Sequence, residues 1–368
     1  MIIPYLFITQ LIIIFSFVRK NVFDYAIFFV LMIFFCTTYF NGSDWRIYEL
    51  LYNDESLFNS YQHWGIGTEL VFSTFRIFGF NFHEMLILVK FFVFSVCFWY
   101  ANKYSKTPVF TFSIFLMLSG YGIFIDNPFR QMLAIPFFLI SNIFIIRRSF
   151  LGFALCLWLG SFLHTSILLF LPIYFLSMIR LNNKYLIFLI ITSYFMSLSD
   201  SILYTVVDSL GKFVPIISFY ARHYLEGEGR FFNISTLIYL SIVFIVYYKS
   251  DKVNFSSISR ELSTSDNLNT IYFFLYVLCV ILSMRIPDIL RFTYYFGLPF
   301  AVFVSTRVSF SISRKIYVLI VCSVLSLNLI LSEYKYVPYT NYIYSRIFDQ
   351  LKDYNYRNSY HYIYHRDL

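Results

Sequence analysis

The chain has 368 residues, of which 59% are hydrophobic, 23% aromatic and only 13% charged. A soluble domain carries about a quarter charged residues, so this composition excludes a soluble globular protein and indicates a polytopic helical membrane protein. The net charge of +8 does not call for a nucleic-acid partner, because Lys and Arg concentrate in the cytoplasmic loops of membrane proteins.

Apolar runs predict where the chain crosses the membrane, and the lysines and arginines between them predict which loops are cytoplasmic. In the first part of the chain the expected spans are residues 2–18, 22–40, 82–101, 108–125 and 128–146. The loop 41–64 has four acidic residues and a single arginine, so it is expected outside. Only one crossing fits between that loop and the lysine-bearing loop 102–107. The short apolar segment 65–80 is therefore predicted to be interfacial or re-entrant.

In the rest of the chain the predicted loops continue to alternate between the external and the cytoplasmic side of the membrane. Residues 149–179 are too long for one span and are predicted to form two short helices that meet at an outer break near His164. Later spans are expected at residues 184–199, 231–248, 269–284, 292–306 and 316–332. The loop 200–230, with an interfacial segment near 200–225, is expected to be external and the loop 249–268 cytoplasmic. The predicted fold is an all-α membrane bundle of about 12 spans over residues 1–332, followed by a tyrosine-rich external tail over 333–368.

A polar stretch, Asp126-Asn127-Pro128-Phe129-Arg130-Gln131, interrupts the apolar sequence between two of these spans. It offers an N-cap residue and a proline suited to a first helical position, so a helix is predicted to begin at Pro128. An arginine at membrane depth needs a partner or a water-filled cavity, unless its side chain snorkels to the headgroups. The amides of a helix N-terminus and the Arg130 guanidinium together favour binding of a diphosphate or a sugar acid. Simple snorkelling is the alternative.

Other ionisable residues fall on the same external side in this topology. The arginines expected to hold a diphosphate and stabilise its departing charge are Arg130, Arg291 and Arg285. The candidates for a base that would accept the proton of a sugar hydroxyl are His164, Asp44 and Glu69. A neutral histidine hydrogen-bonded across helices is an equally weighted interpretation of His164.

The sequence has no HExxH motif, His/Cys cluster, P-loop or GxGxxG motif, so neither a metal nor another cofactor is expected. The five cysteines lie in apolar runs and are expected to be small core residues. The remaining histidines, His63, His83, His361 and His365, are expected at the surface. The tyrosines of the tail fit an aromatic belt at the membrane interface and stacking on sugar rings equally well.

Short motifs follow one another in order between residues 40 and 340. They are Gly42-Ser-Asp44-x3-Tyr48, Glu69 ahead of an apolar segment, Arg130-Gln131-x2-Ala134, Phe162-Leu-His164-Thr-Ser166 before Leu171-Pro172, Arg291-x2-Tyr294-Tyr295-Phe296 and Val337-Pro338-Tyr339. This ordered set resembles the EpsG family of bacterial polysaccharide proteins, which includes Wzy-type O-antigen and capsule polymerases.

The resemblance implies a polymerase at the external, periplasm-facing side of the bacterial inner membrane. Such an enzyme joins oligosaccharide repeat units carried on undecaprenyl diphosphate, and the lipid diphosphate is the leaving group. The family pattern implies functional roles for Arg130, Gln131, His164 and Arg291. It implies a second group of candidate residues, which are Asp44, Tyr48, Glu69 and Tyr294. The partners it implies are lipid-linked oligosaccharides and the bilayer, without nucleic acid. Whether a chain-length regulator also docks on the chain is left open.

Two rival classes of function remain at this point: a transporter, and another enzyme on a similar membrane bundle. A flippase of lipid-linked oligosaccharide would have ionisable residues along the whole path and related halves, whereas the candidates here gather outside. Another lipid-linked-sugar glycosyltransferase usually has a paired acidic motif in its first outer loop, where this chain has the lone Asp44. An O-antigen ligase would need a large outer loop with a catalytic histidine, and the loop 200–230 is modest.

Overall fold

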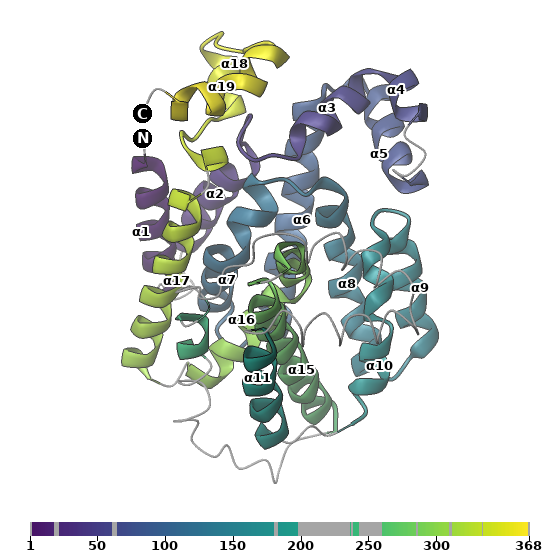
Figure 1. Ribbon diagram of the computed structural model, residues 1–368, viewed down its shortest axis with the longest axis vertical. Helices are drawn as coiled ribbons and strands as arrows, with labels where there is room; N and C mark the ends of the chain where they lie inside the picture. The colour runs from purple at the N-terminus through teal and green to yellow at the C-terminus, as the bar shows by residue number, and fades with distance from the viewer. Residues whose placement is uncertain are drawn as a thin grey trace. The chain divides into compact units, whose positions relative to one another are not determined.

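The computed structural model of the chain describes residues 2–17, 22–60, 65–179, 183–197, 236, 238–242, 260–284, 286–308, 311–332 and 334–366. Within these ranges the chain is helical and forms no strand, which confirms the predicted all-α class (Figure 1). The chain divides into two compact units. Unit 1 is Met1–Tyr174 with Cys322–Leu368, unit 2 is Phe175–Val321, and each is described by itself.

Unit 1 contains both ends of the chain. Its helices are α1 (Ile3–Phe17), α2 (Val22–Cys36), α3 (Trp45–Asn53), α4 (Glu55–Ser60), α5 (Ile66–Ile77), α6 (Phe82–Tyr104), α7 (Pro108–Phe115), η1 (Leu116–Ile125), α8 (Phe129–Ile146), α9 (Phe150–Ser161), η2 (Thr165–Phe170), η5 (Tyr334–Tyr336), α18 (Tyr342–Ile347) and α19 (Tyr354–Arg366). The described helices of unit 2 are α11 (Asn183–Ser197), α15 (Arg260–Leu282), η4 (Pro287–Phe292) and α16 (Thr293–Val308). The boundaries between the units fall within α10 (Pro172–Leu176) and α17 (Ile312–Ser332).

Five helical stretches of the described chain are long and apolar enough to cross a membrane. They are Phe82–Tyr104, Pro108–Ile125, Phe129–Ile146, Pro287–Val308 and Ile312–Ser332. Shorter apolar helices occur at Ile3–Phe17, Ala26–Cys36, Phe150–Ser161, Thr165–Leu176 and Asn267–Leu282. These segments agree with a polytopic membrane protein, while the count of about 12 spans stays a prediction.

Several predicted spans match the helices closely, and one does not. The break expected near His164 is present, because α9 ends at Ser161 and η2 begins at Thr165. By contrast, α15 begins at Arg260, inside the loop predicted to be cytoplasmic over 249–268. The loop 200–230 and most of the span 231–248 lie outside the described residues. The segment 65–80 folds as the 12-residue helix α5, and its interfacial position stays a prediction.

Exposed apolar side chains on α9 show how a helix of unit 1 suits a lipid environment. Leu151, Leu155 and Trp158 are 82%, 53% and 54% exposed and recur at helical spacing, so they form one apolar stripe. A stripe of this kind in water would be an aggregation hazard, whereas lipid covers it without cost.

The helix that leads to the polar stretch 126–131 is widened. After α7 the chain continues as the π-helix η1, which ends at Ile125. π-Helical turns are rare and occur frequently at functional sites. Gly120 lies within η1, and a Cβ there would lie 3.5 Å from the Phe35 ring, an ordinary van der Waals distance, so η1 packs on α2 at this point.

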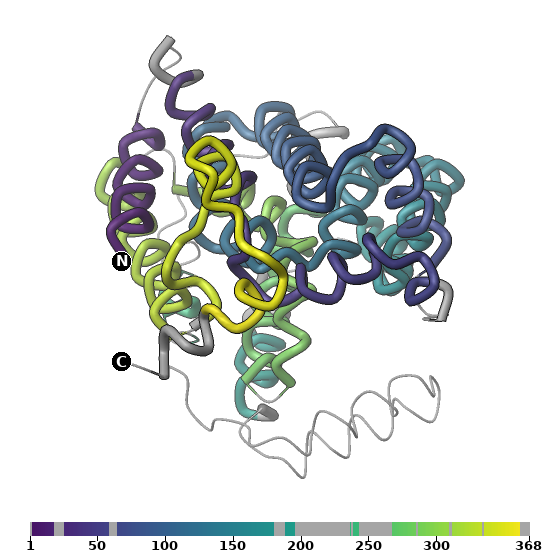
Figure 2. Tube along the Cα trace, turned by 90° about the horizontal axis from the view of Figure 1, so that it is seen from above, coloured from purple at the N-terminus to yellow at the C-terminus, as the bar shows by residue number. Residues whose placement is uncertain are grey.

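The C-terminal segment closes over the segment that follows α2. Asn341 pairs with Thr38 in an isolated antiparallel bridge. The Asn41 carboxamide donates to the carbonyls of Tyr336 and Pro338 and accepts from the amide of Thr340 at 2.7 Å. Helices α18 and α19 therefore lie at the same end of unit 1 as α3, where the yellow C-terminal segment crosses the purple start of the chain (Figure 2).

Candidate functional site

The corner between η1 and α8 is built around the side chain of Asp126. Its Oδ2 accepts a hydrogen bond from Lys335 Nζ at 2.9 Å, and its Oδ1 accepts from the amide and hydroxyl of Ser43 at 3.0 and 2.8 Å. The prediction that this corner supplies a side-chain N-cap was wrong: Pro128 is the N-cap residue of α8, and no side chain caps the helix. Asp126 instead ties the corner to two segments that are distant in the sequence.

Backbone conformation explains why small and amide residues flank this corner. Asn127 has φ 62°, a left-handed conformation that Asn tolerates better than most residues. Its side-chain amide donates to the carbonyls of Ile125 at 2.8 Å and Asn41 at 3.2 Å. Gly42 has φ +87°, and a Cβ there would lie 2.3 Å from the carbonyl oxygen of Ile125. The loop after α2 and the corner before α8 thus pack backbone against backbone.

Arg130 is the second residue of α8, and its guanidinium reaches the N-terminal half of α3. It hydrogen-bonds to the hydroxyl of Tyr48, and Asp44 lies close enough to act electrostatically on the same tyrosine. Burial raises the pKa of Tyr48, and the nearby charge of Arg130 offsets part of that increase. Tyr48 is 5% exposed, whereas Arg130 and Asp44 are half-buried and retain access to solvent. The structure therefore brings three of the predicted residues together in unit 1.

The ring of Phe129 connects this group to α5. Its centroid lies 5.2 Å from that of Tyr48 in α3 and 5.5 Å from that of Phe72 in α5. Phe72 is fully buried and also contacts Tyr52, with ring centroids 5.2 Å apart. The start of α8, which carries Arg130, is held between α3 and α5 by aromatic packing.

His164 and Glu69 lie on segments that are joined by a backbone hydrogen bond. The amide of Gly67 donates to the carbonyl of Phe162 at 3.1 Å, and a Cβ on Gly67 would lie 2.6 Å from that oxygen. Glu69 is exposed in the first turn of α5. His164 is half-buried, and its Nδ1 is 2.6 Å from the hydroxyl of Ser166. This contact orients the imidazole ring.

Other predicted residues stand apart from these contacts. Gln131 is 4% exposed, so the carboxamide is far less accessible than its neighbour Arg130. Arg291 and Tyr294 belong to unit 2, where the exposed Arg291 Nε is 3.8 Å from Asp288 Oδ1. Arg285 lies outside the described residues. The expected convergence of Arg291 with Arg130 and His164 therefore stays a prediction.

An ion pair that the sequence did not suggest holds the C-terminal helix on α3. The guanidinium of Arg357 donates to both carboxylate oxygens of Glu49, at 2.5 and 2.7 Å, and contacts His83 Nε2 at 2.7 Å. It also lies 5.2 Å from the ring centroids of Tyr39 and Trp45. Burial raises the pKa of Glu49, but hydrogen bonds from His83 and Arg357 and their charges outweigh it and hold the pKa at about 2.

The same cluster corrects the expectation for His83. This histidine is 6% exposed, not a surface group. Its Nε2 lies 2.7 Å from Arg357 Nη1 and 3.5 Å from Glu49 Oε2, so the ring is part of the buried ion-pair cluster. No local motif marks Glu49, His83 or Arg357, and only their pairing in space identifies them.

Lys90 is a second buried basic residue, and it lies outside the motifs found in the sequence. It lies in the middle of α6, is fully buried, and donates from Nζ to the hydroxyl of Thr38 at 2.6 Å. A lone lysine within an otherwise apolar span is itself a signal, because intramembrane ionisable residues are rare and often functional. Thr38 also pairs with Asn341 in the antiparallel bridge. The hydrogen bond from Lys90 therefore joins α6 to the segment on which the C-terminal segment packs.

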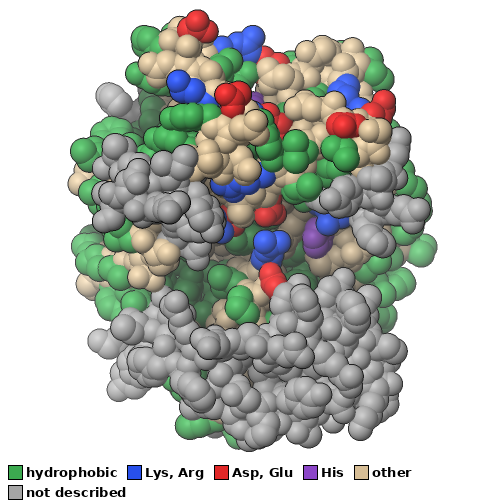
Figure 3. Space-filling view, turned by 45° about the horizontal axis from the view of Figure 1, so that its top comes forward, with side chains coloured by type: hydrophobic (Ala, Val, Ile, Leu, Met, Phe, Trp, Pro, Cys, Tyr) green, Lys and Arg blue, Asp and Glu red, His purple; other side chains and the backbone are tan. Residues whose placement is uncertain are grey.

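The end of unit 1 formed by α3–α5, α18 and α19 carries charged side chains of both signs (Figure 3). Among the described residues no three His, Cys, Asp or Glu side chains gather in a way that could hold a metal ion. The described side chains at this end offer cations, carboxylates, hydroxyls and imidazoles. These groups suit binding of an anion and transfer of a proton.

Comparison with known proteins gives one family. A family model described as the EpsG family matches residues 21–344. Neither the curated proteins nor the solved structures give a match.

Proposed function

The chain belongs to the EpsG family, and from that premise we propose that it polymerises lipid-linked oligosaccharide repeat units at the external face of the bacterial inner membrane. The family is associated with polysaccharide polymerisation. The proposed substrates are repeat units on undecaprenyl diphosphate, drawn from the bilayer. The growing chain would be moved from its lipid carrier to the non-reducing end of the next unit.

The observation that carries this proposal is the position of Arg130. Its guanidinium lies at the start of α8, beside the Tyr48 hydroxyl and partly open to solvent. A planar cation with a hydroxyl beside it suits a phosphate oxygen, and the first amides of a helix favour negative charge. Arg291 and Arg285 are proposed as further contacts to the diphosphate, with Gln131 and Tyr294 supporting the site.

In the proposed reaction a sugar hydroxyl of the acceptor attacks the anomeric carbon of the donor. The bond from that carbon to the diphosphate oxygen breaks, and the electron pair leaves with the lipid diphosphate. Arg130 stabilises the charge that develops on the leaving group. A base accepts the hydroxyl proton, and neither a metal nor a nucleotide takes part.

Asp44 and His164 are the two base candidates that the contacts in unit 1 favour. Asp44 lies in the electrostatic environment of Tyr48 and Arg130, so it is close to the proposed diphosphate. The His164 ring is oriented by Ser166, which suits a general base. Glu69 is exposed on the segment beside His164 and remains a third candidate.

The test is an Arg130→Ala variant expressed in a host that lacks its own polymerase. The expected result is loss of long polymer with retention of single repeat units at the cell surface. Arg147→Ala, at the opposite end of the same helix and exposed, is the matched control and should retain normal polymer. Arg130→Lys should restore polymer only in part, because lysine cannot form two parallel hydrogen bonds with a phosphate.

Two outcomes would contradict the proposal. Full-length polymer in normal amounts from Arg130→Ala would remove Arg130 from the site. Absence of single repeat units from the surface of a deletion mutant would identify a flippase, because a strain without a polymerase still displays single units.

A further inference from the structure

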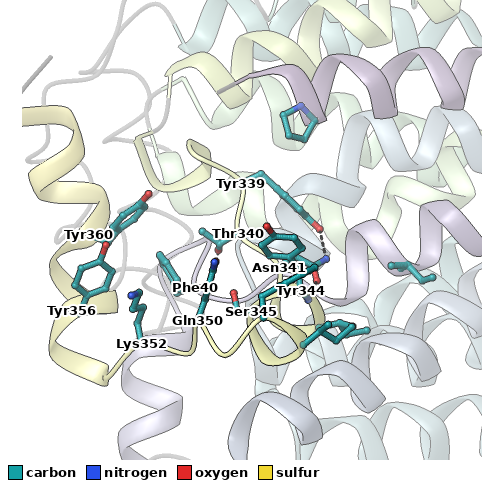
Figure 4. Close-up of a pocket in the computed structure, with 15 residues that line it drawn as sticks. Phe40, Tyr339, Thr340, Asn341, Tyr344, Ser345, Gln350, Lys352, Tyr356 and Tyr360 are labelled. Carbon is teal, nitrogen blue, oxygen red and sulfur yellow. Dashed lines mark hydrogen bonds between the residues drawn. The ribbon is translucent and has the colours of Figure 1, made fainter.

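A cavity of about 690 Å³ opens between the C-terminal segment and the helices α1 and α2. Its walls come from Tyr344 and Ser345 of α18, from Tyr356 and Tyr360 of α19, and from the connection between these helices, which supplies Gln350 (Figure 4). The volume falls within the range of about 300–1,000 Å³ that small-molecule sites occupy. None of the residues assigned to the polymerisation site lines it.

Two of the four tyrosine rings that line the cavity are exposed. Tyr344 and Tyr356 are 55% and 45% exposed. The rings of Tyr356 and Tyr360 lie 5.6 Å apart and are inclined by 37°, so they form a continuous aromatic surface along α19. An exposed aromatic face beside a cavity is suited to a ligand with a flat apolar face and polar edges. A pyranose ring has that character, because its C–H bonds form one face and its hydroxyls point outward.

Polar side chains in the cavity complement the rings. The Gln350 carboxamide and the Ser345 hydroxyl make no hydrogen bond with any residue in the described part of the chain. Between them they offer donors and acceptors, which is what sugar hydroxyls require because each hydroxyl both donates and accepts. Lys352 Nζ lies 5.4 Å from the Tyr356 ring centroid.

The charge of the cavity excludes other ligand classes. Lys352 is its one charged group among the described lining residues, so no carboxylate is present to hold a divalent cation. A single flexible lysine is a poor match for a diphosphate, which favours arginine pairs. A polyprenyl chain would leave the carboxamide and the hydroxyls without partners. A neutral or weakly acidic oligosaccharide fits the aromatic rings, the carboxamide and the hydroxyl.

We propose that this cavity is a sugar-binding subsite that holds a segment of the growing polysaccharide away from the reacting bond. The inference rests on the proposed polymerase function and deepens it. Asn41 connects the two places: its carboxamide accepts from the Thr340 amide at the cavity, while its carbonyl accepts from Asn127, three residues before Arg130. A chain held here would stay with the enzyme between additions, so the subsite would govern polymer length.

The first experiment measures binding to the purified full-length chain in detergent. The probes are oligosaccharides of one and two repeat units, released by partial hydrolysis from the polysaccharide that the chain produces in its complemented host. Tyr356→Ala should bind the two-unit probe about tenfold more weakly than the wild type, and Tyr356→Phe should bind nearly as well because it retains the ring. Asn358→Ala, exposed on α19 and outside the cavity, is the matched control.

Three results would overturn the inference. One is the absence of binding to the wild type, and another is unchanged binding in both Tyr356→Ala and Gln350→Ala. The third is displacement of the two-unit probe by undecaprenyl phosphate but not by the single-unit probe, since that would assign the cavity to lipid. Because Tyr356 and Gln350 are exposed, their substitution should not unfold the chain.

The second experiment separates this inference from the proposed function. In the complemented host, Tyr344→Ala and Tyr356→Ala should make polymer of shorter modal length at nearly normal total sugar, whereas Arg130→Ala should make none. Normal modal length in both tyrosine variants, with polymer lost in Arg130→Ala, would overturn the subsite and leave the polymerase intact. Normal polymer from Arg130→Ala would overturn the polymerase site, while the binding titration would still decide on the cavity.

Discussion

The buried pair of Glu49 and Arg357 makes a quantitative prediction. Replacing Arg357 by Met leaves the Glu49 carboxylate in a site that is 6% exposed, without the two hydrogen bonds of 2.5 and 2.7 Å that now satisfy it. Breaking a buried ion pair in this way costs about 3–5 kcal/mol. The pKa of Glu49, about 2 against a usual 4.5, corresponds to about 3 kcal/mol, which is the net result of the burial cost and of the contacts with both His83 and Arg357.

The assay is the free energy of unfolding of the full-length chain in mixed micelles, measured by SDS titration and by limited proteolysis of the C-terminal segment. Arg357→Met should lose about 3–5 kcal/mol, and the double variant with Glu49→Gln should recover part of it, because the uncompensated charge is gone. Arg346→Met is the matched control: its partner is Glu84, but Arg346 is 57% exposed, so the loss should stay below about 1 kcal/mol. An Arg357→Met loss no greater than that of Arg346→Met would refute the reasoning.

Three further predictions concern the same unit. Gly42→Ala should lower the thermal unfolding temperature more than Gly79→Ala. Both glycines have positive φ, but of the two only Gly42 would place a Cβ against a neighbour, 2.3 Å from the carbonyl oxygen of Ile125. Equal decreases in unfolding temperature would contradict this prediction. Lys90→Met, which removes a buried cation at similar volume, should fold with an unfolding temperature no lower than the wild type. Loss of polymer in folded Lys90→Met would instead assign this lysine a functional role. Because the pKa of Glu49 is depressed, its contribution to stability should be complete above pH 4.5 and disappear as the pH falls towards 2, as unfolding titrations across that window would show.

The sequence predicted what depends on local hydropathy. The helices α6 and α8 begin and end close to the expected spans, and the break before His164 follows from the length of one apolar stretch. The early start of α15 at Arg260 was missed, because a helix can extend beyond the bilayer into polar sequence. Hydropathy marks where the lipid lies and not where the backbone hydrogen bonds end.

Local sequence patterns could not predict side-chain contacts between residues that are distant in the sequence. The stretch 126–131 was expected to supply the N-cap of a helix, yet the Asp126 carboxylate pairs with Lys335, 209 residues away. His83 was expected at the surface because nothing beside it suggested Arg357, 274 residues further on. Arg130 was identified as a site residue because it stands next to a helix start that the sequence itself reveals.

The closure of the C-terminal segment over the start of the chain has a consequence for biogenesis. Asn41 and Glu49 find their partners about 300 residues later, at Thr340 and Arg357. At about 5–20 residues per second, a ribosome needs roughly 15–60 s to make the intervening chain. During that interval the Asn41 carboxamide must stay hydrated or be held by another protein, because its partners in the C-terminal segment have not been made, and Glu49 has His83 but not yet Arg357 beside it. Unit 1 can therefore complete this end only after α18 and α19 have been synthesised, long after the helices α3 and α8 that carry Tyr48 and Arg130.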